Sequence, residues 1–253
     1  MSPILAGTLT FLCTMGGAIL GMMLARSLPA HHLDSESKDV VRISMATVAT
    51  LSALVVGLLI ASAKGSFDER ATELRHAAAQ SLLLDRMLAN YGEEAKPIRA
   101  QLRTIIEKRA AQLAQARDRG VVSVALDDGP QIGAVQEAVL PLVPKDDNQR
   151  WLKSKALDIA ADIAETRWLL VEETQSSIQW PFLIILMFWL GSMFLSFGLF
   201  APRNAMVTMA FLISGLSVGS SIFVILEMDQ PFSGFIRISD TPIRQVISEL
   251  GRP

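Results

Sequence analysis

The chain has 253 residues, of which 51% are hydrophobic, and its 23 basic and 25 acidic residues give a formal net charge of −2. This near-neutral balance gives no indication of a nucleic-acid partner or of a strongly acidic substrate. The single cysteine, Cys13, excludes an intrachain disulfide and a zinc site built from several cysteines.

Four windows contain no charged residue: Ile4–Leu24, Ile43–Ala63, Ile178–Pro202 and Ala205–Leu226. A helix rises about 1.5 Å per residue, so about 20 apolar residues cross a hydrocarbon core about 30 Å thick. Only a helix pairs all its backbone hydrogen-bonding groups within one segment there, so each window predicts a transmembrane helix. Because no basic segment precedes the first window, we expect it to be retained rather than cleaved as a signal peptide.

The first and fourth windows carry small residues on one helix face. In the first window, steps of three and four residues join Gly7, Thr10, Thr14, Gly17 and Gly21. In the fourth, one face carries Ser214, Ser217 and Ser221, and a Gly-x-x-x-Gly pair, Gly215 and Gly219, lies beside it. Small residues let helices approach closely in lipid, so packing is the favoured interpretation for both sets and pore lining is the alternative. No window has a charge near its middle, which argues against a proton pump and is compatible with a passive channel.

The second window begins with hydroxyl side chains and then becomes aliphatic. The candidate pore-lining series runs in steps of three and four residues: Ser44, Thr47, Leu51, Val55, Leu59 and Ala63. If several copies surround an axis, the end of this series, Val55, Leu59 and Ala63, would form an apolar constriction that gates by losing its water. Lipid-facing or core aliphatic surface is the alternative interpretation of the same residues.

The charged residues 65–177 lie between the second and third windows. Helical patterns there cover Ser66–Asn90, Pro97–Arg119, Gln131–Leu142 and about Asn148–Ser177. Gly92 is suited to end the first of these helices, and Pro97 to lie in the first turn of the second. Asp146 or Asp147 is suited to cap the last. We expect the first and last of these helices to continue transmembrane helices two and three into water.

The sequence therefore predicts an all-α membrane protein with four transmembrane helices and a helical extramembrane domain inserted between the second and third. The expected segments are 1–64, with helices one and two; 65–177, the inserted domain; 178–228, with helices three and four; and 229–253, a tail whose short helix begins at Thr241. Six basic residues near span ends on the domain side, against four on the other side, favour a cytoplasmic domain.

Residues 31–36 place His31 and His32 close to carboxylates. The stretch has no pair of histidines four residues apart, so a helix cap from Asp34 or Ser35 is favoured over a metal site. No phosphate-binding loop, nucleophile elbow or dinucleotide fingerprint occurs in the chain. We therefore expect no enzyme, no cofactor and no metal.

Two stretches resemble the bestrophin family. The first follows the second window and contains Phe67, Asp68, Arg70 and Glu73; the second follows the fourth window and contains Glu227, Asp229, Pro231, Phe232 and Gly234. The closer resemblance is to a bacterial bestrophin-like family of unknown function. It extends to Tyr91-Gly92, Arg167-Trp168-Leu169-Leu170 and Phe197-Gly198-Leu199.

Bestrophins are homopentameric ion channels with an all-helical body, whose second span lines the pore and forms an apolar neck. The resemblance implies a homo-oligomer in a bacterial inner membrane, with the lipid bilayer and further copies of the chain as partners and an inorganic ion passing along the axis. By resemblance, Val55, Leu59 and Ala63 occupy neck positions, although Ala63 is smaller than the bulky residues of bestrophin necks. The alternative is a non-conducting, membrane-anchored helical scaffold or sensor whose extramembrane domain binds a partner.

Overall fold

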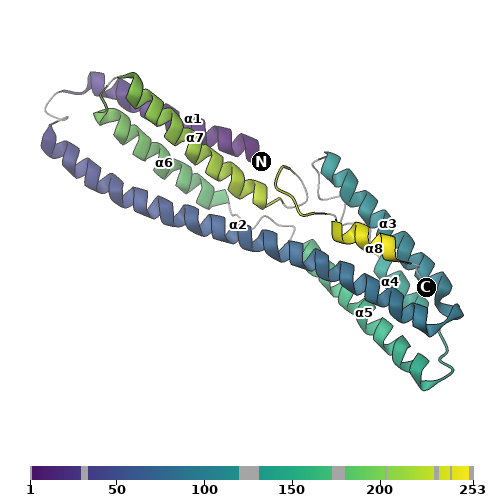
Figure 1. The fold of residues 1–253 in the computed structure, drawn as a ribbon. Helices are drawn as coiled ribbons and strands as arrows, with labels where there is room; N and C mark the ends of the chain where they lie inside the picture. The colour runs from purple at the N-terminus through teal and green to yellow at the C-terminus, as the bar shows by residue number, and fades with distance from the viewer. Residues whose placement is uncertain are drawn as a thin grey trace. The chain divides into compact units, whose positions relative to one another are not determined.

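The computed structural model describes residues 2–29, 34–119, 131–172, 180–202, 204–230, 234–239 and 241–250, and within these ranges it is helical and contains no strand. In chain order the elements are α1 (Pro3–Ser27), α2 (Ser35–Tyr91), the 3-10 helix η2 (Glu93–Ala95), α3 (Lys96–Arg119), α4 (Gln131–Val139), α5 (Asp147–Glu172), α6 (Trp180–Phe200), α7 (Ala205–Met228) and α8 (Thr241–Glu249) (Figure 1). The chain divides into two compact units. The membrane unit comprises Met1–Gly65 and Ser177–Asp229, and the extramembrane unit comprises Ser66–Ser176 and Gln230–Pro253.

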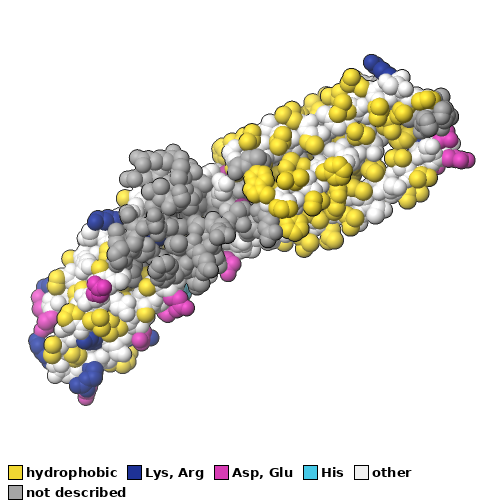
Figure 2. All heavy atoms as spheres, turned by 180° about the vertical axis from the view of Figure 1, so that it is seen from behind, with side chains coloured by type: hydrophobic (Ala, Val, Ile, Leu, Met, Phe, Trp, Pro, Cys, Tyr) yellow, Lys and Arg dark blue, Asp and Glu magenta, His cyan; other side chains and the backbone are white. Residues whose placement is uncertain are grey.

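Four helices, α1, α2, α6 and α7, are long and apolar enough to cross a membrane, as the four charge-free windows predicted. Hydrophobic side chains cover most of the visible surface of the membrane unit, whereas charged side chains gather on the extramembrane unit (Figure 2). With 57 residues, α2 is about 85 Å long and therefore far longer than a bilayer core is thick. The second membrane helix thus runs without a break into the inserted segment. The predicted continuation of the last inserted helix into the third span falls on residues 173–179, outside the described residues.

In the membrane unit, α1 packs against both α6 and α7, and glycines make the closest contacts. All five small residues of the α1 stripe are buried: Gly7, Thr10, Thr14, Gly17 and Gly21. A Cβ atom at Gly21 would lie 2.1 Å from the carbonyl oxygen of Leu195, and one at Gly7 would lie 2.9 Å from that of Gly219. Neither contact leaves room for a side chain, so the stripe is a packing surface. The threonine hydroxyls bond within α1 rather than across the interface, because Thr10 donates to the carbonyl of Ala6 at 2.8 Å.

The apolar core of the membrane unit is formed mainly by α6 and α7, with the membrane part of α2 and, from α1, Ala6. Its buried members include Ala63, Leu183, Leu186, Leu190, Ile222 and Ile225. Val55, Val56 and Leu59 of α2 are partly buried against the same cluster. One face of α2 is therefore occupied within its own subunit.

The extramembrane unit has a separate core, to which α3, α4, α5, α8 and the last turns of α2 contribute. Its most deeply buried side chains include Leu84, Leu88, Leu102, Val135 and Val139. The tail helix α8 packs against α3 and adds Ile243 and Val246 to this core. The tail therefore folds with the inserted segment.

The ends of the extramembrane helices follow local chemistry. Gly92, with a φ of 123°, lies in a region that favours glycine and ends α2. Asp146 accepts a hydrogen bond from the backbone N–H of Gln149 at 2.6 Å and caps α5. Asp34 likewise accepts from the N–H of Ser37 at 2.9 Å, so the capping interpretation holds for the start of α2.

Candidate functional site

The membrane part of α2 has the smallest share of buried residues among the four membrane helices. Within the most apolar window of each helix, 6% of the α2 residues are buried, against 39% in α1, 28% in α6 and 22% in α7. The occupied side of α2 includes Ser52 and Ala63, whereas Leu54 and Leu58 are 60% and 62% exposed. We call the side that carries Thr47, Leu51, Leu54 and Leu58 the open face of α2.

The predicted pore-lining series does not stay on this open face. Ser44, Thr47 and Leu51 are exposed, Val55 and Leu59 are half-buried, and Ala63 is completely buried. A helix turns about 100° per residue, so positions four apart drift by about 40° and the series winds from the open side to the occupied side. Ala63 faces the core of its own subunit and has no free surface. Pore lining by the other residues of the series stays a prediction. Beyond Leu51, the exposed residues on the open face are Leu54 and Leu58.

At its start the open face is weakly polar. The hydroxyls of Ser44 and Thr50 each donate to the carbonyl four residues earlier, at 2.9 Å, and Thr47 does the same at 3.4 Å. Because each hydroxyl oxygen keeps acceptor capacity, this part of the helix can contact water, whereas the stretch from Leu51 to Leu58 cannot form hydrogen bonds through its leucines.

The serines of α7 lie beside its packing face. Ser214 and Ser217 are exposed and Ser221 is half-buried. The hydroxyls of Ser217 and Ser221 donate to carbonyls one turn earlier, at 2.9 and 3.0 Å. Gly215 and Gly219 make the contact with α1, where their Cβ atoms would meet Thr14 Oγ1 at 3.1 Å and the carbonyl of Gly7 at 2.8 Å. The glycines are thus packing residues, and the serines are not needed for that contact.

Three of the bestrophin-like motif residues are buried charged side chains. Arg70, Glu227 and Asp229 are 7%, 3% and 8% exposed. Phe67 and Glu73 are half-buried, and Asp68 is exposed. All six take part in polar, ring or electrostatic interactions. For the three buried charged side chains, such partners offset the cost of burial. Gly234 has a φ of 90°, which favours glycine. Pro231 and Phe232 lie outside the described residues.

The extramembrane unit contains a buried ion pair that no sequence pattern predicted. Asp85 of α2 is 1% exposed and accepts two hydrogen bonds from Arg99 of α3, from Nε at 2.8 Å and from Nη2 at 2.9 Å. The hydrogen bond to Asp85 raises the pKa of the Arg99 guanidinium. The two residues are brought together by the turn at Gly92, and no spacing rule links positions 14 apart.

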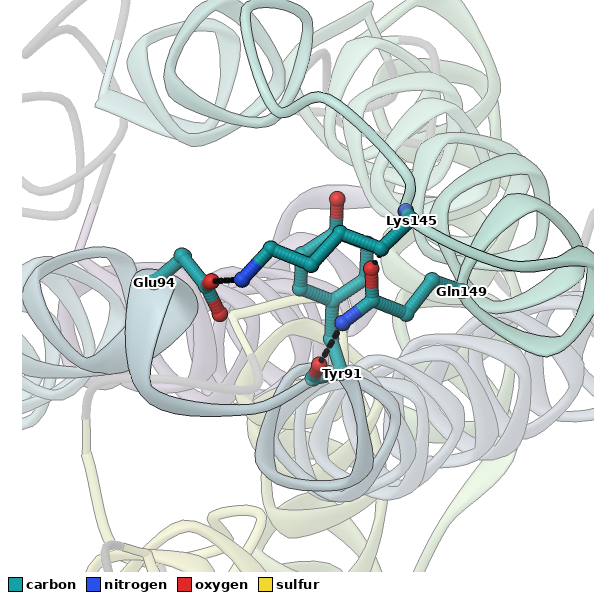
Figure 3. A network of polar contacts seen from close by, with 4 residues as sticks. All are labelled: Tyr91, Glu94, Lys145 and Gln149. Carbon is teal, nitrogen blue, oxygen red and sulfur yellow. Dashed lines mark hydrogen bonds and ion pairs between the residues drawn. The ribbon is translucent and has the colours of Figure 1, made fainter.

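A second polar cluster surrounds the end of α2 (Figure 3). Gln149 donates to the carbonyl of Tyr91 at 2.8 Å, and Lys145 pairs with Glu94. The Tyr91 hydroxyl is buried and has no hydrogen-bond partner among the described residues. Burial, followed by the nearby Glu94 carboxylate, raises the pKa of Tyr91. The hydrogen bond from Lys145 lowers the pKa of Glu94, and the same bond raises that of Lys145.

Among the described residues, no group of three or more His, Cys, Asp and Glu side chains could hold a metal ion. The stretch with His31 and His32 lies outside the described residues.

Four apolar helices, a charged helical unit and a membrane helix with an unoccupied face define an all-helical integral membrane protein. A family profile described as the bestrophin-like domain matches residues 12–243. The chain therefore belongs to the bestrophin-like family.

Two solved structures resemble the fold over its full length. Both are crystal structures of a bacterial bestrophin homologue from Klebsiella pneumoniae that carries a single mutation. One has a TM-score of 0.63 and 16% identity and covers 100% of each chain; the other has a TM-score of 0.57 and 14% identity and covers 96% of this chain and 97% of that one. At such identities the likeness concerns the fold. No curated protein matches the chain.

Proposed function

We propose that this protein is the subunit of a homo-oligomeric channel for inorganic ions, in which the open face of α2 surrounds the axis. The observation that carries the proposal is the exposure of Leu54 and Leu58 at 60% and 62% on a helix whose other side is already packed. Membership of the bestrophin-like family supports a channel-like body, and the resemblance to bestrophins makes a pentamer the expected assembly.

The chemistry of the open face fits a passive constriction. Leu54 and Leu58 are one turn apart, so a ring of copies would place two apolar layers in series, and such layers gate by dewetting. Thr47 and Leu51 would lie on the approach to these layers. No charge occurs within the α2 window Ile43–Ala63, so the proposal includes no proton relay and no catalytic step. We place the protein in a bacterial inner membrane with the extramembrane unit in the cytoplasm.

The test compares two neighbouring leucines. Purified full-length protein is reconstituted in planar bilayers as wild type, Leu58→Ser and the matched control Leu59→Ser. We expect Leu58→Ser to raise the current, because a ring of hydroxyls hydrates the constriction. Leu59→Ser should change the conductance of folded channels less than Leu58→Ser, because Leu59 is half-buried against the core of its own subunit. If wild type carries no current as an oligomer, or if only Leu59→Ser alters it, the proposal is wrong.

A second measurement separates a pore from a lipid-facing surface. In a Cys13→Ser background, Leu58→Cys should react with a charged, membrane-impermeant thiol reagent and lose current. A cysteine that faces lipid would not react with a charged reagent, since such a reagent does not enter hydrocarbon.

A specific observation also favours the alternative of a partner-binding scaffold. In the extramembrane unit, Val143, Trp151 and Leu140 are 80%, 58% and 55% exposed, and exposed apolar side chains that form one patch mark sites of interaction with a partner. If Trp151→Glu abolishes capture of a cellular protein while wild type carries no current, the scaffold function replaces the channel function.

A further inference from the structure

A cavity of about 370 Å³ lies between two helices of the membrane unit, where α1 ends and α7 begins. Its lining residues are Ile19, Met22, Met23 and Arg26 from α1 and Asn204, Ala205 and Thr208 from α7. None of its described lining residues belongs to the open face of α2 or to the polar clusters of the extramembrane unit, so none of the roles assigned above accounts for it.

The cavity follows from where the glycines lie. The first half of α1 is held against α7 by Gly7 and by Thr14, which meet Gly219 and Gly215. Towards its end α1 instead makes its closest contacts with α6, where a Cβ atom at Gly21 would lie 2.1 Å from the Leu195 carbonyl. No glycine occurs in α7 before Gly215. Without a glycine contact to bring the helices together, the space between this end of α1 and the start of α7 is left unfilled.

The lining changes from apolar to charged along one face of α1. Ile19, Met23 and Arg26 are four and three residues apart, so they follow one another on this face. At about 1.5 Å per residue, Arg26 lies about 10 Å beyond Ile19 along the helix axis. Arg26 is the first charged residue after the window Ile4–Leu24, which places it at the boundary between hydrocarbon and headgroups. Ile19 and Met23 are 45% and 58% exposed within the hydrocarbon region.

Charge selects the ligand. Among the described residues that line the cavity, Arg26 is the only charged one and none is a carboxylate. The first turn of α7 adds the partial positive charge of a helix N-terminus beside it, with Asn204 held in place by the hydrogen bond it accepts from Val207 at 2.8 Å. A guanidinium binds phosphate oxygens in a planar, two-pronged geometry. Flexible methionine side chains adapt to an alkyl chain.

We propose that this cavity binds an anionic phospholipid, with the phosphate at Arg26 and an acyl chain along Ile19, Met22 and Met23. The site requires only that the protein is inserted in a membrane, so it does not depend on ion conduction.

The test uses the full-length protein, purified in uncharged detergent and stripped of lipid. Phosphatidylglycerol, phosphatidylcholine and inorganic phosphate are titrated separately, and bound molecules are counted by native mass spectrometry. Wild type should prefer phosphatidylglycerol. One basic residue near a membrane surface contributes about fivefold to the affinity for an anionic lipid, so Arg26→Gln should lose about fivefold. Arg26→Lys should keep most of the preference.

Two variants make the result specific. Arg42→Gln removes the same charge from an exposed position at the start of the second span that does not line the cavity, and it should bind as wild type does. Ala205→Phe fills the cavity while it keeps Arg26, and it should lower phosphatidylglycerol binding. The proposal is overturned if Arg26→Gln and Arg42→Gln lose binding equally. It is also overturned if inorganic phosphate displaces the lipid fully and Ala205→Phe has no effect, because the site then takes a free anion.

Discussion

Replacement of Arg99 by methionine should strongly destabilise the extramembrane unit. Asp85 is 1% exposed and the Arg99 side chain 15% exposed, so neither charge of this pair is well screened by water. Removal of one partner from a buried ion pair costs about 3–5 kcal/mol, because the remaining charge keeps its desolvation penalty. Since Arg99 retains some contact with water, we expect a loss near the lower end, about 3 kcal/mol.

The matched control is Arg103→Met, one turn further along α3. Arg103 also donates to a carboxylate, that of Glu107, at 2.8 Å, but their side chains are 51% and 46% exposed. An exposed pair of this kind contributes about 0.3–0.5 kcal/mol. For a domain of this size, 1 kcal/mol shifts the melting temperature by roughly 3–5 °C, so Arg99→Met should lower it by roughly 10–15 °C and Arg103→Met by roughly 2 °C or less.

The assay is thermal unfolding of the full-length protein in detergent, with hydrogen exchange to localise the loss to α3 and the end of α2. The double variant Asp85→Leu with Arg99→Met should be more stable than Arg99→Met alone, because it removes the buried Asp85 charge together with its Arg99 partner. Equal decreases in melting temperature for Arg99→Met and Arg103→Met would refute the claim that burial determines how much the Asp85–Arg99 pair contributes to stability.

Two further predictions concern burial and close packing. Tyr91 is the only tyrosine in the chain and its pKa is raised from 10.0, so the ultraviolet titration of tyrosinate should have a midpoint above 10.0 in the folded protein and near 10.0 in denaturant. A raised pKa means that Tyr91 keeps its proton to a higher pH in the folded state than in the unfolded state. The free energy of unfolding should therefore fall as the pH rises above about 10, and Tyr91→Phe should remove that loss. A folded midpoint at or below 10.0 would contradict the assignment. Gly198→Ala should cost roughly 1–3 kcal/mol, because its Cβ atom would lie 2.1 Å from the Ala18 carbonyl oxygen. Gly16→Ala, whose Cβ atom meets nothing within 4 Å, should be neutral, and equal melting temperatures for the two variants would argue against the α1–α6 contact.

The sequence was enough to predict the membrane helices, because about 20 consecutive, predominantly apolar residues without a charge favour a helix that crosses the hydrocarbon core. The small-residue stripe of α1 was also predictable, since small side chains have one evident use between helices in lipid. Helix caps such as Asp34 and Asp146 were predictable too, because each cap bonds a backbone N–H only three residues further along the chain.

The open face of α2 could not be predicted in the same way. In water, the polar side of an amphipathic helix marks its exposed face, but from Leu51 onward the membrane part of α2 has large aliphatic side chains on several sides and no charged one. Leu58 is exposed and Leu59 is half-buried, and nothing in their chemistry distinguishes them. Only the partners from α6 and α7 decide which leucine packs. The Asp85–Arg99 pair was missed for a related reason, because it depends on how two helices meet after Gly92.

The glycine contacts of α1 have a consequence for biosynthesis. The helices against which α1 packs begin at Trp180 and Ala205, roughly 150 residues or more after α1 ends. At about 5–20 residues per second, α1 leaves the ribosome roughly 8–30 s before α6 begins to appear. During this interval the hydroxyls of Thr10 and Thr14 already have acceptors within α1 itself. The threonine hydroxyls of α1 can therefore stay hydrogen-bonded in lipid before α6 and α7 are synthesised. The glycine contacts with these two helices form afterwards and depend on close packing.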